Sequence, residues 1–458
     1  MRRWLSLLTL GLMSIPLVLW WQGMPLNAIG QEELPAPRRA PDSPQYRGAG
    51  SCAAAACHNS HIVNANAASE FAIWSSQDRH AKAYEVLFEE RSTLIQKHLR
   101  SKAPAHEEQR CLNCHVTPNL DPSFISEARY FKTDGVSCES CHGPAGKWLG
   151  VHHLPAWQKL SSDAKKIQGM SDTQSLVGRA QVCVRCHVGE AGMDVDHDLI
   201  AAGHPRLHFE FTAFHAFMPR HWPDAKDRDP LASSRGRRDF EARAWVVGKM
   251  ATARAALELL ADRAADSKKP WPEFAEHDCA ACHQDLQASR KSKERGPRKL
   301  GTMPWGHHVN LTPEILAILG DRDNAAKIKT TLTDLQDAMT KAIKPNRDNV
   351  ARDAKSAALL LNSLLDQLDH RLPDVLDVNQ LLEAVLGKEG RAYADQATQI
   401  DLGAAALYRA HRDLKRTLPA KLYDSLLQRK MDNPKSYDPE AIRRRLGEFK
   451  NLDIKKDP

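Results

Sequence analysis

The sequence predicts a mainly α-helical protein made of two parts. Helical periodicity can be read in several segments, whereas the apolar–polar alternation that is typical of strands is scarce. All ten cysteines lie between residues 52 and 282, and none follows residue 305. We therefore expect a cysteine-bearing domain at 48–288, with short helices and much loop, followed by a small α-helical domain at 305–458.

The N-terminus has the layout of a secretory signal. Two arginines precede a mostly apolar run that ends at Trp21, and a weak cleavage cue ends at Ala28. We expect residues 1–28 to form a signal peptide, with an uncleaved N-terminal membrane anchor as the alternative. The proline-rich residues 29–47 then form a linker. The protein is thus expected to be periplasmic or otherwise exported, either soluble or anchored.

Four apolar stripes with helical spacing predict the longer helices. Two lie in the cysteine-bearing part, from His80 to Ile95 and from Val246 to Ala264. Residues 289–304 are strongly basic and contain glycine and proline, which is typical of a solvated linker. Beyond it, two further stripes fall in 354–368 and 400–414. These stripes predict the helices of the C-terminal domain.

The ten cysteines form five pairs, and a histidine directly follows each pair. Four pairs have the spacing C-x-x-C-H and one has the wider C-x-x-x-x-C-H. In chain order they are motif 1 (Cys52, Cys57, His58), motif 2 (Cys111, Cys114, His115), motif 3 (Cys138, Cys141, His142), motif 4 (Cys183, Cys186, His187) and motif 5 (Cys279, Cys282, His283). Two thiols about one helical turn apart can add to the two vinyl groups of one haem, and the adjoining histidine then reaches the iron.

This pattern predicts covalently bound haem c at motifs 2 to 5. We also expect haem at motif 1, where the small residues Ala53 to Ala56 allow the two extra residues to loop out. The alternatives at motif 1 are a Cys52–Cys57 disulfide, or a single thioether with a spare thiol. Structural zinc would have to combine two cysteine pairs, and disulfides within C-x-x-C are strained. Neither explains a histidine after every second cysteine.

A haem iron needs a second axial ligand if it is to carry electrons without binding a substrate. The sequence has 21 histidines, of which five lie in the motifs. His80, on the apolar face of its predicted helix, is the leading candidate, followed by His152 or its neighbour His153, and by His204 between a glycine and a proline. Further candidates are His61, His221 and His308, then His197, His208, His215, His277 and His307.

The formal net charge of +7 would suggest an acidic partner such as nucleic acid. Five haems, however, would add about ten negative charges from their propionates, which reverses the balance to roughly −3. We therefore expect no nucleic-acid partner. Arg206 is expected to pair with a haem propionate.

Three stretches resemble the cytochrome c-554 type of multihaem protein. Motif 2 together with G-V-S-C-E-S-C-H-G-P at 135–144 looks like its haem sites, and Trp74 with His80 resembles the histidine helix that precedes them. Residues 202–207 and His221 look like segments of larger relatives. The resemblance covers roughly residues 48–288 and implies closely stacked haems, mostly helical packing, a periplasmic location and electron transfer. Five motifs and the added helical domain depart from the four-haem pattern.

These observations predict an electron carrier between redox proteins outside the cytoplasmic membrane. Motifs 2 and 3 start 27 residues apart, so we expect their haems to form the tightest pair. The alternative is a multihaem oxidoreductase that acts on a small nitrogen or sulfur compound at an open-coordinate haem. No catalytic residue is assigned. In a third interpretation, residues 305–458 form a docking module. The sequence predicts neither the oligomeric state nor the identity of the redox partners.

Overall fold

The computed structural model describes residues 45–59, 69–117, 132–222, 240–279, 282–283, 303–372, 376–387 and 394–410. The expected signal peptide, and most of the two expected linkers at 29–47 and 289–304, lie outside these ranges. All the described residues belong to one compact unit. Within the described ranges, none of the helices combines the length and the apolar character that a membrane crossing requires.

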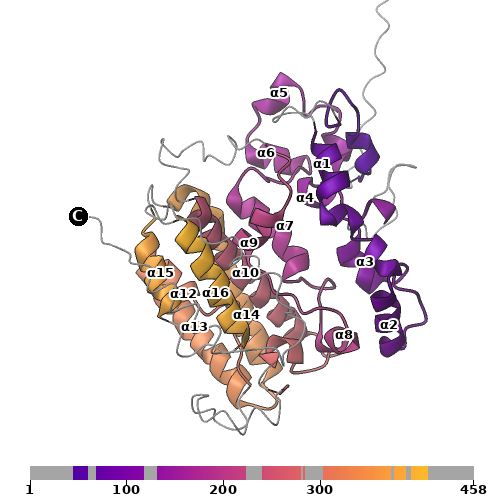
Figure 1. Cartoon of the computed structure of the whole chain (residues 1–458). Coiled ribbons are helices and arrows are strands. Elements are labelled where there is room, and N and C mark those ends of the chain that lie inside the picture. The colour runs from indigo at the N-terminus through magenta and orange to yellow at the C-terminus, as the bar shows by residue number, and fades with distance from the viewer. Residues whose placement is uncertain are drawn as a thin grey trace, which may run out of the picture. The chain divides into compact units, whose positions relative to one another are not determined.

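The cysteine-bearing part is built from short helices joined by loops (Figure 1). Its α-helices are α1 (Glu70–Gln77), α2 (Glu90–Leu99), α3 (Gln109–His115), α4 (Cys138–His142), α5 (Pro155–Gln158), α6 (Ser162–Ile167), α7 (Leu176–His187), α8 (His197–Ala202) and α9 (Phe211–Phe217). Its 3₁₀ turns are η1 (Ala49–Cys52), η2 (Arg79–Lys82), η3 (Glu85–Phe88), η5 (Lys132–Asp134), η6 (Ala145–Lys147) and η8 (Phe274–Glu276).

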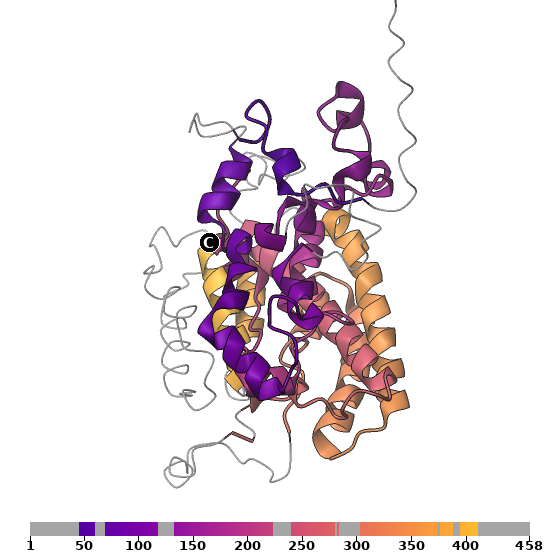
Figure 2. The ribbon, with the colours of Figure 1, turned by 90° about the vertical axis from the view of Figure 1, so that its right-hand side faces the viewer.

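The longer helices gather in a bundle around α10 (Phe240–Ala265), as the two views in Figures 1 and 2 show. The others are α12 (Thr312–Ile318), α13 (Arg322–Lys341), α14 (Arg347–Arg371), α15 (Val378–Leu386) and α16 (Ala394–Ala410). Helix α10 packs most extensively against α14, and also against α7, α9, α12 and α16. It is buried on nearly every side, which agrees with a sequence that is apolar around much of its circumference.

One hydrophobic core joins the two parts of the chain. It includes Val184 of α7, Trp245 of α10 and Leu361 of α14. Burying one such Leu or Val side chain stabilises a fold by about 1.5–3 kcal/mol. Packing here is close, because a Cβ added at Gly248 of α10 would lie 2.4 Å from the Cβ of Phe211 in α9. The division into separate domains at 289–304 stays a prediction.

The predicted fold class, mainly α, is confirmed. In the described part of the chain only isolated β-bridges occur, such as Glu190 with Met193. The stripes at 246–264 and 354–368 lie in α10 and α14 as expected. The single helix predicted from His80 to Ile95 is wrong: η2, η3 and α2 follow one another there. Its break falls at Glu89, whose extended backbone (ψ 159°) ends η3 before α2 begins.

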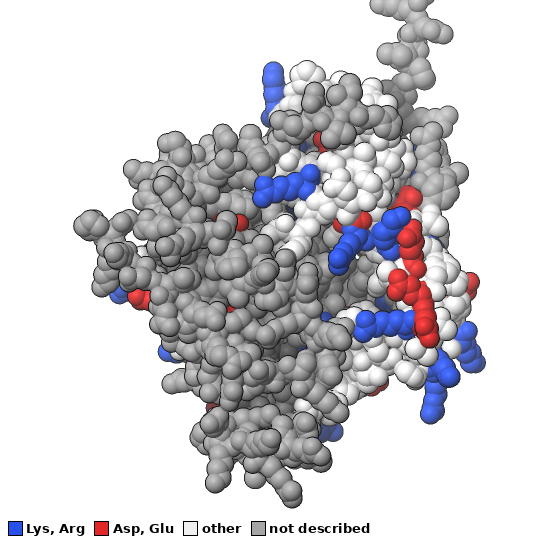
Figure 3. Space-filling model, viewed as in Figure 1, with Lys and Arg blue, Asp and Glu red and all other residues white. Residues whose placement is uncertain are grey.

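Charged side chains of both signs stand next to one another on the described part of the face in Figure 3. Among the described residues, exposed ion pairs join Lys82 to Glu85 at 3.1 Å and Arg185 to Glu190 at 3.0 Å. Pairs this exposed contribute about 0–1 kcal/mol. The described part of this face therefore has no continuous patch of positive charge, although the formal net charge is positive.

Candidate metal centres

The motif histidines stand at the ends of short helices. Helix α3 ends at His115, α4 at His142 and α7 at His187. In each helix the first motif cysteine lies one turn before the histidine and the second lies directly before it. At motif 5 a single helical turn does the same, since the His283 N–H donates to the Cys279 carbonyl oxygen at 2.9 Å. Residues three apart lie on one helix face, so both thiols of a motif can reach the same planar group.

Motif 1 accommodates its two extra residues in a turn. Segment η1 ends at Cys52, and the N–H groups of Cys57 and His58 both donate to the Ala54 carbonyl oxygen, at 2.9 and 3.1 Å. Cys57 is exposed and Cys52 is half-buried. The turn therefore takes up the two extra residues, and Cys57 is followed directly by His58 as in the other four motifs.

Each motif histidine faces a second histidine from elsewhere in the chain. The ring centroids are separated by 6.0 Å for His58 and His152, 6.0 Å for His187 and His80, 6.4 Å for His115 and His204, 6.4 Å for His142 and His221, and 6.3 Å for His283 and His197. The five separations fall within a few tenths of an ångström of one another. Such a narrow range would not arise from five unrelated surface contacts.

The separation suits one iron atom between two imidazoles. Metal–nitrogen bonds to histidine are ~2.0–2.1 Å long, and each nitrogen lies ~1.1 Å from its ring centre, so an iron with two axial histidines would hold the ring centroids about 6.3 Å apart. The angles between ring planes are near-perpendicular at motifs 2 to 4, with values of 90°, 75° and 79°. They are smaller at motifs 1 and 5, with values of 14° and 26°. All five pairs therefore fit a haem iron.

Hydrogen bonds at Nδ1 orient seven of these ten imidazoles. The bonds join His58 to Glu70 Oε2 (3.2 Å), His80 to Asp78 Oδ1 (2.9 Å), His115 to the Ala83 oxygen (2.7 Å), His142 to Thr173 Oγ1 (3.3 Å), His152 to the Leu149 oxygen (2.8 Å), His204 to the Pro205 oxygen (2.7 Å) and His221 to the Pro219 oxygen (3.4 Å). An imidazole whose Nδ1–H donates leaves its Nε2 lone pair available for a metal.

The imidazole of His187 is held by aromatic rings instead. Its ring lies 5.4 Å from Phe209 at an angle of 18° and 4.9 Å from Phe214 at 66°. The two phenylalanines also contact each other, with ring centroids 4.9 Å apart. Packing therefore fixes the plane of His187.

Burial favours the neutral imidazole that metals bind. It lowers the pKa of His142 and of His187 to about 4, and it also lowers the pKa of His115, His204 and His221. At His80 burial acts in the same direction, but the hydrogen bond and the charge of Asp78 outweigh it, and the pKa is raised. At the five histidines whose pKa is lowered, burial therefore favours the neutral ring that a metal can bind.

Contacts between thiols show which motifs are neighbours. The Cys52 thiol of motif 1 lies beside Cys138 of motif 3, and the Cys114 thiol of motif 2 lies beside Cys186 of motif 4, so that each thiol shifts the pKa of its neighbour. We expected motifs 2 and 3 to form the tightest pair. That expectation stays a prediction. The thiols that lie side by side belong to motifs 1 and 3 and to motifs 2 and 4.

Motif 3 is fixed by carboxylates and backbone groups that the sequence reasoning did not single out. Glu139, buried between the two motif cysteines, accepts the N–H groups of Arg47, Gly48 and Ala145 at 2.7–3.0 Å. The Val136 N–H donates to the His80 oxygen at 2.9 Å. These bonds hold the first described residues and the His80 turn against motif 3.

The structure brings each leading sequence candidate next to a motif histidine. His80 lies by His187, His152 by His58 and His204 by His115, whereas His153 is exposed. His61 lies outside the described residues. His221 and His197, which the sequence ranked lower, complete the pairs at motifs 3 and 5.

Two signals for the second ligands were present in the sequence. Asp78 stands two residues before His80, and its side chain accepts both the backbone N–H and the ring N–H of that histidine. A short acidic side chain at the start of a turn commonly binds the backbone in this way. His221 precedes Trp222, and their ring centroids lie 5.0 Å apart.

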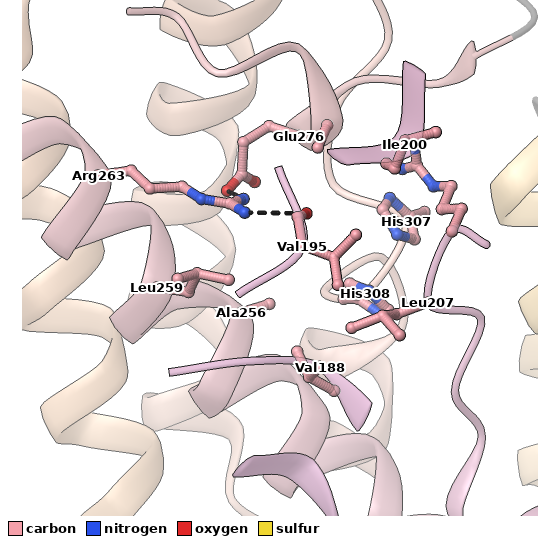
Figure 4. A pocket seen from close by; sticks show the side chains of 12 residues that line it. Val188, Val195, Ile200, Leu207, Ala256, Leu259, Arg263, Glu276, His307 and His308 are labelled. Atoms are coloured by element: carbon pink, nitrogen blue, oxygen red, sulfur yellow. Dashed lines mark hydrogen bonds and ion pairs between the residues drawn. The ribbon is translucent and has the colours of Figure 1, made fainter. Parts of the chain in front are cut away.

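His307 and His308 line a cavity instead of facing a motif histidine (Figure 4). The cavity measures about 50 Å³, room for a few water molecules. Arg263 borders it and donates to Glu276 at 2.7 Å and to the Val195 oxygen at 3.3 Å. The cavity lies beside motif 5, because Glu276 precedes Cys279 by three residues.

Arg206 also lies at motif 5. Its Nη1 donates to the His277 oxygen at 3.1 Å and to Cys279 Sγ at 2.9 Å. The expected pairing of Arg206 with a propionate stays a prediction. All ten cysteines are among the described residues, and no disulfide joins any two of them. No three His, Cys, Asp or Glu side chains of the described ranges converge as a metal site built from protein ligands alone would require.

Comparison with known proteins gives one match. Residues 52–143 fit the family model described as cytochrome c554 and c-prime, a segment that begins at Cys52 of motif 1 and ends directly after motif 3. No curated protein and no solved structure matches the chain. The match confirms the resemblance over residues 52–143, and it supports haem c binding and electron transfer by a c-type cytochrome.

Proposed function

Starting from a segment of cytochrome c554 type, we propose that the chain is a multihaem c-type cytochrome that passes electrons between redox proteins outside the cytoplasmic membrane. It binds five haems c, one at each motif, through two thioethers and two axial histidines. The observation that carries this proposal is the set of five histidine pairs, with ring centroids 6.0–6.4 Å apart. The looser motif 1 has the same pair spacing as the others, which supports a fifth haem.

Two axial histidines at every iron favour an electron carrier over an enzyme. The bound haems supply one-electron oxidation and reduction, and an iron with both axial positions filled has no site for a substrate. Hydrogen bonds at Nδ1 and aromatic packing from the chain hold most of the ligand planes. The alternative, an oxidoreductase for a small nitrogen or sulfur compound, requires that one of these imidazoles leave its iron.

The neighbouring motifs imply an order along which electrons move. The thiol contacts link motif 1 to motif 3 and motif 2 to motif 4. Motifs 3 and 4 are linked in turn, because helices α4 and α7 that carry them pack together. Helix α8 begins at His197, the partner of motif 5, and His204, the partner of motif 2, follows its end. The order is therefore 1–3–4–2–5, with the exposed Cys57 at one end.

The groups that accept a hydrogen bond from the axial imidazoles differ between motifs, and this difference should give the haems different reduction potentials. At motifs 1 and 4 a carboxylate accepts from one axial imidazole, Glu70 from His58 and Asp78 from His80. At motif 2 both axial imidazoles face backbone carbonyl oxygens instead. A carboxylate acceptor makes the imidazole a stronger donor to the metal and favours the ferric state. Motifs 1 and 4 are therefore expected to have lower potentials than motif 2.

The intact mass of the mature protein, made in a host that matures c-type cytochromes, tests the number of haems. Five haem increments are expected, and four in the double variant Cys52→Ser, Cys57→Ser, which serves as the matched control for motif 1. The same measurement reports whether the N-terminal segment is cleaved or remains as an anchor. Fewer than five increments in the wild type would contradict the proposal.

Spectroscopy of the ferric and ferrous protein separates carrier from enzyme. A carrier with two histidines at each iron is expected to be entirely low-spin and to ignore carbon monoxide, nitrite and hydroxylamine. A high-spin fraction that binds one of these molecules would favour the oxidoreductase alternative.

A further inference from the structure

The last described helix, α16, reaches back to the region of motif 4 through one buried amide. Gln399 is 1% exposed, and its Nε2 donates to the Phe209 carbonyl oxygen at 2.9 Å. Its Oε1 accepts from Lys249 Nζ of α10 at 3.4 Å, and the same Nζ donates to the His308 oxygen at 3.4 Å. A chain of polar contacts thus joins α10 and α16 to the segment that precedes α9.

Burying the polar side chains of Gln399 and Lys249 between the helices has a high free-energy cost. Burying an amide or an ammonium group costs several kcal/mol unless its partners compensate fully, and well-packed apolar residues often serve stability better. Lys249 is fully enclosed, and burial lowers its pKa to about 8, opposed only by the charge of the buried Glu210. The surrounding core is apolar, with Trp245 and Met250 nearby in α10. Stability alone is therefore a poor explanation for Gln399.

Gln399 binds the backbone of Phe209, and the ring of Phe209 packs on the motif 4 histidine His187. Phe209 is 1% exposed and stacks on His187 at 5.4 Å, with 18° between the ring planes. The described structure gives Nδ1 of His187 no hydrogen bond, in contrast to seven of the other paired imidazoles. The plane of His187 therefore depends on Phe209 and Phe214.

We infer that Gln399 is a positioning residue for the haem at motif 4. By fixing the backbone at Phe209, it sets the plane of His187 relative to that of His80, which stands at 79°. The angle between two axial imidazole planes governs the energies of the iron d orbitals, and hence the paramagnetic spectrum and the potential of that iron. The C-terminal helices thus act on one haem out of five. This inference rests on the proposed function.

Two variants and one control test it. Gln399→Met removes the amide and keeps a side chain of similar length, and Phe209→Leu removes the stacked ring. The control is Gln336→Leu, because the Gln336 Nε2 also donates to a backbone oxygen of another segment, that of Trp305 at 3.3 Å. Trp305 stacks on none of the ten paired histidines in the described structure.

Intact mass, electron paramagnetic resonance of the ferric protein and a potentiometric titration are measured on each full-length variant. Five haems are expected in all of them. One of the five low-spin signals shifts in Gln399→Met, and the same signal shifts in Phe209→Leu, together with one potential. The control leaves all five signals in place. Unchanged signals in Gln399→Met, or a change spread over several haems, would overturn the inference.

The outcomes separate this inference from the proposed function. Five haems with no shift refute only the positioning role of Gln399. Fewer than five haems in the wild type refute the proposed function itself.

Discussion

Replacing the buried lysine of α10 by methionine changes the free energy of unfolding by an amount that depends on pH. Lys249 is 2% exposed, and burial lowers its pKa to about 8, against an ordinary value of about 10.4 in an unfolded chain. Below pH 8 the amine is protonated in both states, and the cost of burying its charge is fully present. Between pH 8 and 10.4 the unfolded chain binds more protons than the folded one, so the free energy of unfolding rises with pH.

The magnitude follows from the shift. A difference of about 2.4 pKa units corresponds to about 3 kcal/mol at 1.36 kcal/mol per unit. The variant Lys249→Met has no amine there and lacks this contribution. The free energy of unfolding of the wild type should therefore rise relative to that of the variant by about 3 kcal/mol from pH 7 to above pH 10.

Guanidinium unfolding followed by far-ultraviolet circular dichroism at pH 7, 8, 9, 10 and 11 measures this difference. Titrations shared by both proteins cancel in the comparison. The matched control is Lys329→Met, since Lys329 is an exposed lysine of α13 and its loss should give a difference that does not change with pH. Parallel curves for the wild type and Lys249→Met would refute the reasoning.

Four further substitutions have expected outcomes. Arg263→Met removes a buried guanidinium from two carboxylates at 2.7 and 2.9 Å, and should lower the free energy of unfolding by about 3–5 kcal/mol in guanidinium titrations. Glu139→Gln turns an acceptor of three backbone N–H groups into a partial donor, with an expected loss of about 1–3 kcal/mol in the same assay. Gly143→Ala, at φ 83° with its new Cβ 2.1 Å from a backbone oxygen, should lower the melting temperature through a cost of about 1–3 kcal/mol. His221→Ala should convert one haem in five to a high-spin form that binds carbon monoxide, visible in the ferrous difference spectrum.

The sequence predicts the haem attachment sites best, because all the residues of one motif are close together in the chain. A cysteine pair and its histidine lie within one turn, so the five motifs could be found without any knowledge of the fold. The second histidines are harder, because the partner of His115 lies 89 residues away and that of His142 lies 79 residues away. His80 and His204 stood out by an apolar face and by a rigid Gly–Pro setting.

His197 and His221 gave weaker signals. His197 starts the short helix α8, and its partner His283 lies beyond the long helix α10. Only the folding back of the chain around α10 brings the two rings to 6.3 Å. The helix predicted from His80 to Ile95 failed because the period of apolar residues continues through two 3₁₀ turns and the extended backbone at Glu89.

The central place of α10 affects the time course of folding. This helix is enclosed by α14 and α16, which the ribosome makes later. Until those residues emerge, only α7 and α9 can cover α10, and the apolar sides that face α14 and α16 stay open. The newly made chain therefore stays open until its C-terminal helices arrive. The enzyme that attaches haem to the motif cysteines can reach their thiols more easily in this open chain, because most of these thiols are half-buried in the folded protein.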